Sequence, residues 1–281
     1  RALFCVARPK GDVTIEARDV RKAGDIVLKT LPCRIEQLER VADDVMILRF
    51  KLPANERLQY RAGQYIEFLL KDGKRRSFSM ANAPHDDALI ELHIRHLPGG
   101  LFTDRVFGVS TPALKVRDIL RFEGAHGGFY LRDDSDKPII LLASGTGFAP
   151  IKAIVEHMIH TGNVRPVVLY WGGRRPSDLY LDELACGWAA QHPQWFRYVP
   201  VVSDALPEDA WDGRTGFVHR AVMQDLPDLS GYQVYACGAP VVVDSARVDF
   251  TTQCNLPEAD FFADSFVVAA QADAVATAAS K

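Results

Sequence analysis

Residues 138–150 of the chain, PIILLASGTGFAP, decide the fold of its second half. Successive large apolar residues predict a buried strand, and the two glycines around Thr146 predict a sharp turn at its end. Pro150 suits the opening turn of a helix, and apolar residues recur at helical spacing from Ile151 onward. Such a helix N-terminus presents free N–H groups to an anion. Because Pro150 stands where the third glycine of G-x-G-x-x-G would be, a nucleotide site and an ordinary strand–turn–helix corner both stay open.

The composition is typical of two globular domains without a strong charge preference. The chain has 281 residues and a formal net charge of −3, so its overall charge does not favour nucleic acid as a partner. No apolar run approaches the ~20 residues of a membrane helix, so no membrane partner is expected either. Five scattered cysteines without a Cys-x-x-Cys motif are typical of a reducing compartment, which favours a cytoplasmic protein.

The two halves of the chain differ in their pattern of apolar residues. From about Pro32 to Asp134, short apolar runs are separated by turn signals such as Asp72-Gly73, which predicts an antiparallel barrel or sandwich. From Pro138 onward, strand-like runs alternate with helix-like stretches, which predicts βαβ units and a doubly wound parallel sheet. The charged segment 132–138 is the predicted linker between them.

Small or polar residues follow each of four predicted strands in the second half. Ligands of a doubly wound sheet bind beyond the carboxyl ends of its strands, so these residues are expected to share one rim. A structural corner explains one such strand end, but four together favour a ligand site. The residues are Gly145, Thr146, Gly147, Gly172, Gly173, Arg174, Ser203, Asp204, Cys237, Gly238, Ala239 and Pro240.

Two motifs in the first half carry groups suited to a nucleotide. Arg76-Ser77-Phe78-Ser79 offers a guanidinium for a phosphate, an aromatic face for a flat heterocycle and a hydroxyl for a ring atom. Gly99 and Gly100 allow the backbone to approach a phosphate closely, and Thr103 adds a hydroxyl. Taken alone, the first motif also fits a basic strand end with a core phenylalanine, and the second also fits a hairpin or helix cap.

Taken in order, these motifs resemble those of the ferredoxin–NADP reductase-like flavoenzymes. The similarity covers about residues 32–266 and rests on Arg76–Ser79, Gly99–Thr103, Gly145–Pro150 and Cys237–Pro240. It implies an antiparallel FAD-binding β-barrel followed by an α/β doubly wound parallel sheet that binds a nicotinamide nucleotide. The class that it implies is an NAD(P)H-dependent flavoprotein reductase.

The resemblance implies a FAD site on the barrel. Arg76 would pair with the pyrophosphate, Phe78 would stack on the isoalloxazine in place of the family's usual tyrosine, and Ser79 would bond near flavin N5. Ser79, Cys237 and Asp264 are the implied catalytic residues, although a last core strand with one exposed acid also explains the segment around Asp264. The residues implied to complete the FAD site are His93, Ile94, Arg95, Gly99, Gly100, Thr103 and Phe266.

The resemblance also implies a nicotinamide nucleotide site on the parallel sheet. The Gly-x-Arg…Asp-Leu-Tyr pattern over residues 172–180 looks like that of the NADH-preferring members, so NADH is favoured over NADPH. The residues implied to bind the nucleotide are Gly145, Thr146, Gly147, Gly172, Arg174, Tyr180, Ser203, Cys237, Gly238 and Pro240.

The first residues resemble the end of a plant-type 2Fe-2S ferredoxin domain. Cys5 has the Cys-x-x-x-Pro context of the fourth cluster cysteine, but the three earlier cysteines of that spacing do not occur in this chain. Cys5 is therefore expected to be an orphan ligand, with the 2Fe-2S cluster belonging to an intact, longer protein shortened by proteolysis or by choice of the expressed segment. An N-terminal extension with an incidental cysteine is the alternative.

The predicted domains follow from these signals. Residues 1–29 are a ferredoxin remnant and linker, 30–134 the FAD-binding barrel, 135–268 the NAD(P)-binding domain and 269–281 a disordered tail.

The expected activity is electron transfer from NADH through FAD to a 2Fe-2S cluster and then to a redox partner protein. Reductases with ferredoxin, FAD and NAD modules serve dehydrases that act on CDP-6-deoxy-hexuloses, as well as oxygenases, and the resemblance is greatest to the CDP-6-deoxy-Δ3,4-glucoseen reductase type. Two alternatives stay open. One is a stand-alone NAD(P)H flavin reductase without an iron–sulfur domain, and the other is a non-catalytic nucleotide-binding electron-carrier subunit.

Overall fold

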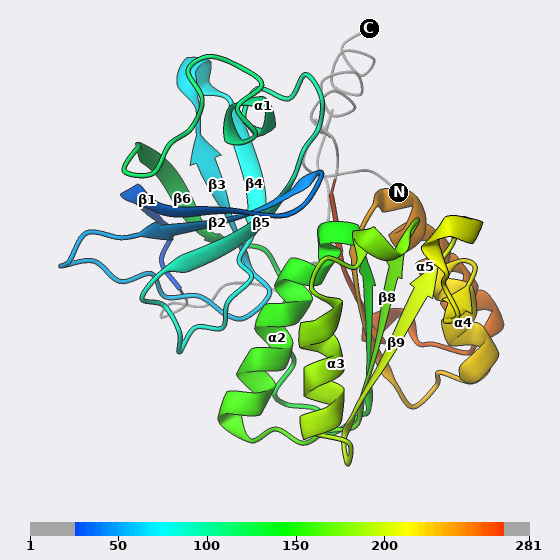
Figure 1. Cartoon of the computed structure of the whole chain (residues 1–281). Coiled ribbons are helices and arrows are strands. Elements are labelled where there is room, and N and C mark those ends of the chain that lie inside the picture. Colours follow the sequence, from blue (N-terminus) through cyan, green and yellow to red (C-terminus); the bar gives the residue numbers. More distant parts are fainter. Residues whose placement is uncertain (1–25, 267–281) are drawn as a thin grey trace, which may run out of the picture.

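The computed structural model describes residues 26–266, which form two six-stranded sheets, one in each half of the chain (Figure 1). All paired strands of the first sheet are antiparallel, in the order β4-β3-β6-β1-β2-β5. A bridge between Met80 and Leu92 joins the two edge strands, so the sheet curls into a barrel. The strands are β1 (Lys29–Ala42), β2 (Val45–Lys51), β3 (Tyr65–Leu69), β4 (Arg75–Ser79), β5 (Ile90–Arg95) and β6 (Ile119–His126).

The barrel encloses a core of alternate side chains from each strand. Phe50 and Phe122 are fully buried with ring centroids 5.3 Å apart, and Phe68 packs 6.0 Å from Phe50. The short helix α1 (Thr103–Val106) adds Val106 to the same core. In β5, for example, every second residue belongs to this core, namely Ile90, Leu92 and Ile94, which is the pattern expected for a strand with one face inside a barrel.

The second sheet is parallel throughout, in the order β10-β9-β8-β7-β11-β12. Its strands are β7 (Ile139–Ser144), β8 (Val167–Gly173), β9 (Phe196–Val202), β10 (Arg214–Thr215), β11 (Gln233–Gly238) and β12 (Phe261–Ser265). Its helices are α2 (Phe148–Thr161), α3 (Asp182–Gln191), α4 (Val218–Asp225) and α5 (Pro240–Gln253). The 3₁₀ turns of the two halves are η1 (Lys71–Gly73), η2 (Gly145–Gly147), η3 (Pro176–Asp178), η4 (Pro207–Asp209) and η5 (Glu258–Asp260).

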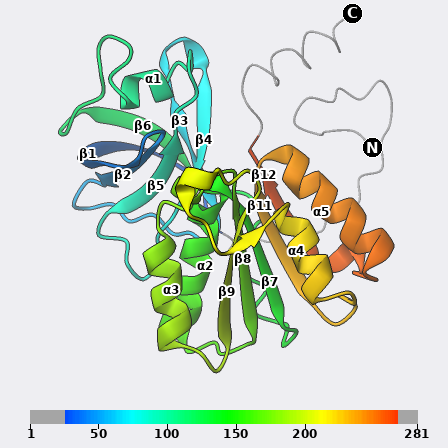
Figure 2. The same ribbon diagram turned by 45° about the vertical axis from the view of Figure 1, so that its right-hand side comes forward.

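Helices cover both faces of the parallel sheet (Figure 2). Ile139 and Leu141 of β7 belong to the core shared with α2 and α3, whereas Ile140 and Leu142 belong to the core shared with α4 and α5. A strand that is buried on both faces has no polar side to present, which explains the continuous apolar run in its sequence.

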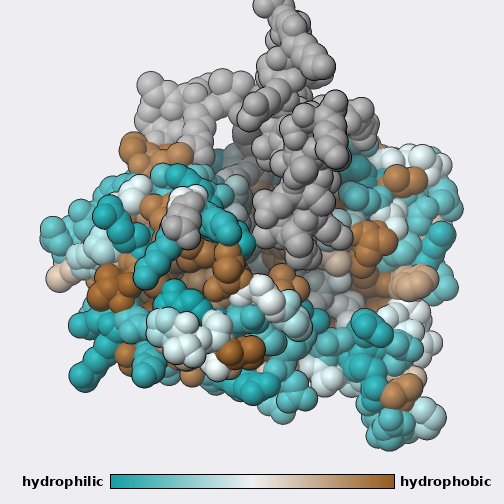
Figure 3. Space-filling view, turned by 90° about the horizontal axis from the view of Figure 1, so that it is seen from above, coloured by the Kyte–Doolittle hydropathy of each residue, from teal (hydrophilic) through white to brown (hydrophobic). Residues whose placement is uncertain are grey.

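The fold class predicted from the sequence is confirmed, and the barrel alternative holds for the first half. The predicted domain boundaries stay predictions, and most of the predicted ferredoxin remnant, including Cys5, and all of the predicted tail lie outside the described residues. Among residues 26–266, no helix is both long and apolar enough to cross a membrane. The face seen from above mixes hydrophilic and hydrophobic residues (Figure 3).

Candidate active site between the barrel and the parallel sheet

The turn after β7 packs against the end of β11 more closely than side chains would allow. A Cβ atom on Gly147 would lie 2.1 Å from the carbonyl oxygen of Cys237, and one on Gly238 would lie 2.5 Å from that of Ser144. The turn is also held from the next strand, because the Trp171 indole Nε1 donates a hydrogen bond of 3.0 Å to the Gly145 carbonyl. Gly147 and Gly238, both predicted from the sequence, are therefore required by packing.

The structure brings the three predicted catalytic residues together. Ser79, at the end of β4 in the barrel, donates a hydrogen bond of 3.2 Å from Oγ to the Oδ2 atom of Asp264 in β12. The register of β11 against β12 pairs Cys237 with Asp264. Phe266 follows at once, and its backbone N–H donates to the Gly238 carbonyl at 2.9 Å. A barrel hydroxyl, a partly buried carboxyl and a buried thiol thus meet where the two sheets touch.

Burial controls the charge state of this group. It raises the pKa of Asp264 to about 6, although the hydrogen bond from Ser79 favours the ionised form. Burial and the neighbouring Asp264 carboxyl also raise the pKa of the Cys237 thiol well above its ordinary value. Cys237 is therefore a neutral thiol near pH 7, while Asp264 can take up or release a proton close to that pH.

Arg95 carries unmet hydrogen-bond donors next to the Gly145 turn. A Cβ atom on Gly145 would lie 3.4 Å from its Nη2 atom, and both Nε and Nη2 are buried without a hydrogen-bond partner among the described residues. Its carboxylate neighbours are at longer distances, with Asp44 at 3.3 Å from Nη1 and Asp178 at 3.6 Å from Nη2. Buried N–H groups without partners are costly, so this position suits an anion such as a phosphate of a bound nucleotide.

The barrel motif offers two accessible groups in the predicted positions. Arg76 is partly exposed and donates from Nη1 to the carbonyl of the neighbouring Arg75 at 2.7 Å. Phe78 is partly exposed and packs against Phe102, with ring centroids 5.4 Å apart. These side chains fit the phosphate and the flat ring of a flavin nucleotide, which is the group that the motif implies.

The glycine loop after β5 is shaped by its own hydrogen bonds. Thr103 donates from Oγ1 to the Leu97 carbonyl at 2.9 Å, and a Cβ atom on Gly100 would lie 2.4 Å from that hydroxyl. Gly99 has a φ of +80°, a conformation that favours glycine. The side chain of Thr103 therefore supports the loop, and its predicted contact with a pyrophosphate stays a prediction.

Three other predicted side chains, those of His93, Ile94 and Tyr180, pack against other protein side chains. Ile94 lies in the barrel core, and His93 is buried between Glu91 and Tyr180. Their side chains therefore contact protein, and a role toward FAD would pass through the β5 backbone. The Tyr180 hydroxyl bonds His93 at 2.8 Å, so its predicted part in nucleotide binding also stays a prediction.

The remaining predicted residues lie at the carboxyl rim of the parallel sheet. Gly172 ends against α4, where a Cβ atom would lie 2.8 Å from that of Val218, and Pro240 is the first residue of α5. The Ser203 backbone N–H donates to the Gly173 carbonyl at 3.0 Å. Arg174 is exposed and has its Nη2 atom 3.4 Å from Oδ2 of Asp204. Thr146, also at this rim, is buried within η2.

Phe217 at the same rim was not singled out by the sequence. Its side chain is 67% exposed at the start of α4. The available signal is a large aromatic residue directly after Gly216, where a φ of +107° turns the chain outward.

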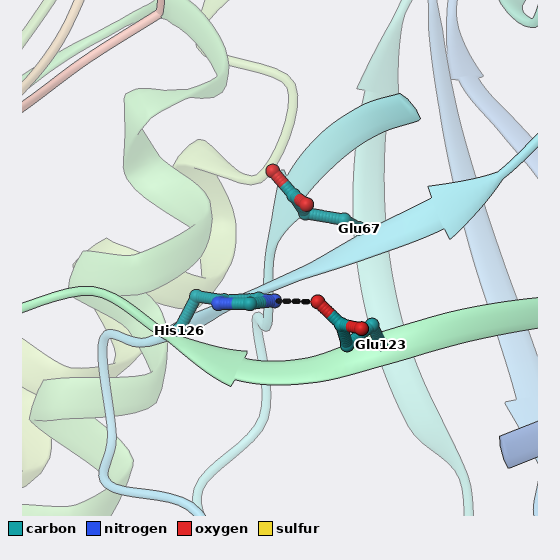
Figure 4. Close-up of side chains that lie close together, drawn as sticks. All are labelled: Glu67, Glu123 and His126. Atoms are coloured by element: carbon teal, nitrogen blue, oxygen red, sulfur yellow. Dashed lines mark ion pairs between the residues drawn. The ribbon is translucent and has the colours of Figure 1, made fainter. Parts of the chain in front are cut away.

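Three barrel side chains of types that can bind a metal lie close together, but the Arg75 guanidinium already supplies a positive charge to them. Glu67 of β3 lies near Glu123 and His126 of β6, with His126 Nε2 3.4 Å from Glu123 Oε1 (Figure 4). The Arg75 Nη1 atom lies 2.9 Å from Glu67 and 2.7 Å from Glu123, so its guanidinium balances both carboxylates. We interpret this group as an ion-pair cluster.

The cysteines of the described residues do not form an iron–sulfur ligand set. Cys33, Cys186, Cys237 and Cys254 are free, and they belong to separate elements. Burial raises the pKa of Cys33 to about 12, which disfavours the thiolate that a cluster requires. The part of the chain that the structure describes therefore does not fit a 2Fe-2S cluster.

Family models match both halves of the chain. Residues 32–130 match the model of an oxidoreductase FAD-binding domain, and residues 141–247 match that of an oxidoreductase NAD-binding domain. The chain is 42% identical over 265 residues to the CDP-6-deoxy-L-threo-D-glycero-4-hexulose-3-dehydrase reductase of Yersinia pseudotuberculosis, covering 94% of this chain and 77% of that protein. It is 36% identical to reductase component 2 of the terephthalate 1,2-dioxygenase of Comamonas sp., covering 95% and 77%.

A solved structure extends the likeness to three dimensions. The Amycolatopsis cytochrome P450 reductase GcoB superposes with a TM-score of 0.78 and 31% identity, covering 89% of this chain and 74% of that protein. The chain therefore belongs to the ferredoxin reductase-like family of FAD- and NAD-binding oxidoreductases and is an NAD(P)H-dependent flavoprotein reductase.

Proposed function

We propose that the chain takes electrons from NADH through FAD and delivers them to a 2Fe-2S acceptor that serves a dehydrase or oxygenase. The observation that carries this proposal is the hydrogen bond of 3.2 Å between Ser79 and Asp264, which joins the barrel motif to the nucleotide-binding sheet. Bound FAD would supply the chemistry, accepting a hydride from the reduced nicotinamide and releasing electrons singly. The protein residues then position both nucleotides and manage the proton.

On the barrel side, Arg76 and Phe78 are the residues that would hold the flavin nucleotide. The Arg76 guanidinium can form a forked bond to phosphate oxygens, and the Phe78 ring can cover an apolar face of a heterocycle. The Gly99-Gly100 loop would bring its backbone close to the pyrophosphate. Ser79 ends the same strand, so its hydroxyl stands at the boundary toward the second nucleotide.

On the sheet side, the Gly145–Gly147 turn would hold the nicotinamide nucleotide. Arg95, which the family resemblance assigns to FAD, would serve this nucleotide instead because it lies beside the turn. The turn lies at the carboxyl end of β7, where doubly wound sheets bind ligands, and the unmet donors of Arg95 face it. Phe217 provides an exposed aromatic face at the rim that suits the adenine ring. The Cys237 thiol, neutral and fully buried, would limit the space for the nicotinamide ring.

Ser79 and Asp264 would manage the proton that accompanies hydride transfer. When Asp264 is protonated, its carboxyl can donate to Ser79 Oγ instead of accepting from it. The Ser79 hydroxyl can then donate its proton to a ring nitrogen that gains negative charge, and Asp264 replaces that proton and is left ionised. A carboxyl with a pKa of about 6 is suited to this exchange near pH 7.

We further propose that NADH is preferred over NADPH. Asp204, two residues beyond the end of β9, has a side chain that is 62% exposed at the rim. A carboxylate there can accept hydrogen bonds from a ribose diol and would repel a 2′-phosphate. The neighbouring Arg174 is already paired with Asp204, which reduces the positive charge left for a phosphate.

The named relatives indicate the class of partner. One is a reductase of a CDP-6-deoxy-hexulose dehydrase and another is a reductase component of a dioxygenase, so either kind of enzyme could receive the electrons. We favour the dehydrase because that relative shares the higher identity, 42% against 36%. The iron–sulfur cluster that accepts the electrons would be bound by other cysteines, since those of the described residues are unsuited to it.

The test compares two serines on one strand. Ser79→Ala should slow flavin reduction by NADH on the order of 100-fold, the loss typical of one preorganised donor, whereas FAD content stays unchanged. Ser77→Ala is the control, because Ser77 is exposed and bonds only Glu67 among the described residues, at 3.2 Å. Equal rates for both variants and the wild type in anaerobic stopped-flow absorbance would exclude the role assigned to Ser79.

A further inference from the structure

Four polar side chains form a bonded network across the junction of the barrel and the parallel sheet. Glu91 and His93 come from β5, Lys152 comes from α2, and Tyr180 follows η3. Glu91, His93 and Lys152 are buried. We call this group the junction network, and none of its bonds involves Ser79, Cys237 or Asp264.

Glu91 is the residue that both arms of the junction network share. Its Oε1 atom lies 2.9 Å from His93 Nε2 and 3.2 Å from Lys152 Nζ, and its Oε2 atom accepts from Arg49 Nε at 2.7 Å. Burial opposes its charge, but the bond from His93 and the charge of Lys152 hold the pKa of this carboxyl well below its ordinary value. Glu91 is therefore an ionised hub that accepts hydrogen bonds only.

The charge of Glu91 determines the direction of the next two bonds. Burial lowers the pKa of His93, so the ring is neutral and donates from Nε2 to the carboxylate. Its Nδ1 atom must then accept, and the Tyr180 hydroxyl donates to it at 2.8 Å. Burial raises the pKa of Tyr180 well above its ordinary value, which keeps this hydroxyl protonated. One arm therefore runs from Glu91 through His93 to Tyr180.

Both arms lead to the Gly145–Gly147 turn. The Tyr180 and Trp171 rings pack edge-to-face with their centroids 5.3 Å apart, and the Trp171 indole donates a hydrogen bond to the Gly145 carbonyl. On the other arm, Lys152 lies one turn into α2, the helix that begins directly after the glycine turn. Its Nζ atom also donates to the Ala81 carbonyl at 3.2 Å, two residues beyond Ser79.

We propose that Glu91, His93, Lys152 and Tyr180 are positioning residues that hold the Gly145–Gly147 turn in a fixed relation to the Ser79 end of the barrel. This inference rests on the proposed function, in which hydride transfer requires the two nucleotides to meet at near-attack distance. Misplacement by about 1 Å can cost up to about 100-fold in rate.

The composition of the junction network supports positioning over simple stabilisation. Buried ion pairs add little to stability compared with apolar side chains of similar volume, whereas their directional bonds restrict relative orientation. The two cores on either side are already large and apolar, so cohesion does not require a charged junction. The directional bonds instead connect the elements that carry the predicted nucleotide sites.

The test removes one hydroxyl from each of two tyrosines in the FAD-loaded protein. Tyr180→Phe deletes the bond to His93, and Tyr170→Phe is the matched control, because its hydroxyl bonds Asp225 at the end of α4 at 2.9 Å and contacts no member of the junction network by a hydrogen bond. Lys152→Met tests the second arm. Hydrogen exchange of residues 144–152 and the limiting rate of flavin reduction by NADH are both measured.

Tyr180→Phe should speed exchange of this segment about fivefold, the factor that one buried hydrogen bond typically contributes. It should lower the limiting rate of flavin reduction about tenfold with little change in NADH affinity, and Lys152→Met should act in the same direction. Exchange and rate equal to those of Tyr170→Phe would overturn the proposal. If NADH fails to reduce the wild-type flavin, the proposed function is lost, but the exchange comparison still decides whether the junction network holds the turn.

Discussion

Asp264→Asn offers a quantitative test of the electrostatics at the candidate active site. Burial raises the pKa of Asp264 from an ordinary value of 3.8 to about 6, so the protonated form is favoured in the folded protein. As the pH rises above 3.8, the unfolded chain gains more from ionisation than the folded protein does. The stability contributed by the protonated carboxyl is therefore present at low pH and lost as the pH rises to about 6.

The pKa difference sets the size of this loss. It corresponds to a total of about 3 kcal/mol, of which about 2 kcal/mol falls between pH 4 and pH 7. The asparagine variant does not titrate, so the wild type should lose that amount relative to Asp264→Asn over this range. Other titrating groups cancel in the difference between the two proteins.

The assay is urea unfolding of flavin-free wild type and Asp264→Asn, followed by circular dichroism at unit steps from pH 4 to pH 7. Ser79→Ala provides a check of sign, because loss of the bond that favours the carboxylate should move the midpoint of the trend to higher pH. A difference in unfolding free energy that stays constant over the whole range would show that burial does not raise the pKa of Asp264.

Two further substitutions test the nucleotide rim and the glycine turn. Asp204→Arg should raise the ratio of kcat/KM for NADPH to that for NADH at least about tenfold, because it replaces a charge that repels the 2′-phosphate with one that attracts it. An unchanged ratio in steady-state assays would show that Asp204 plays no part in coenzyme selection. Gly147→Ala should destabilise the protein by about 1–3 kcal/mol and abolish tight NADH binding, because its Cβ atom would lie 2.1 Å from the Cys237 carbonyl. Gly187→Ala is its control in thermal unfolding and NADH titration, because the nearest atom to a Cβ there is 3.7 Å away in the exposed part of α3. Equal behaviour of the two alanine variants would contradict the packing argument.

The parallel sheet could be predicted closely because its strands are continuous apolar runs. The buried strand expected within residues 138–150 is β7 (Ile139–Ser144), and the helix expected from Ile151 onward forms most of α2. Helix α2 begins earlier than Pro150, because η2 leads directly into it. Period and composition therefore locate an element, while its ends depend on the local turn.

The longest barrel strand was missed for a physical reason. Strand β1 contains Pro32 and several charged residues, which hide an alternation of buried Leu31, Cys33 and Ile35. Only pairing with β2 and β6 makes this stretch a strand. Alternation over three positions was the signal that could have found it.

The junction network and the orientation of Arg95 could not be predicted from the sequence. Glu91 and Lys152 are 61 positions apart in the chain numbering, and their 3.2 Å contact arises only when α2 packs on the barrel. Local motifs predict which side chains can bind a phosphate, but tertiary packing decides which of them remain available. Arg95 has two N–H groups without a hydrogen-bond partner among the described residues, whereas the His93 ring is hydrogen-bonded to Glu91.

The central claim is that NADH reduces a flavin bound to this chain. The most direct measurement is the visible spectrum of the FAD-loaded protein before and after anaerobic addition of one equivalent of NADH. The expected result is a flavin band that is bleached by NADH and restored by an oxidised 2Fe-2S acceptor protein. A protein that binds no FAD, or whose flavin band is unchanged by NADH, would contradict it.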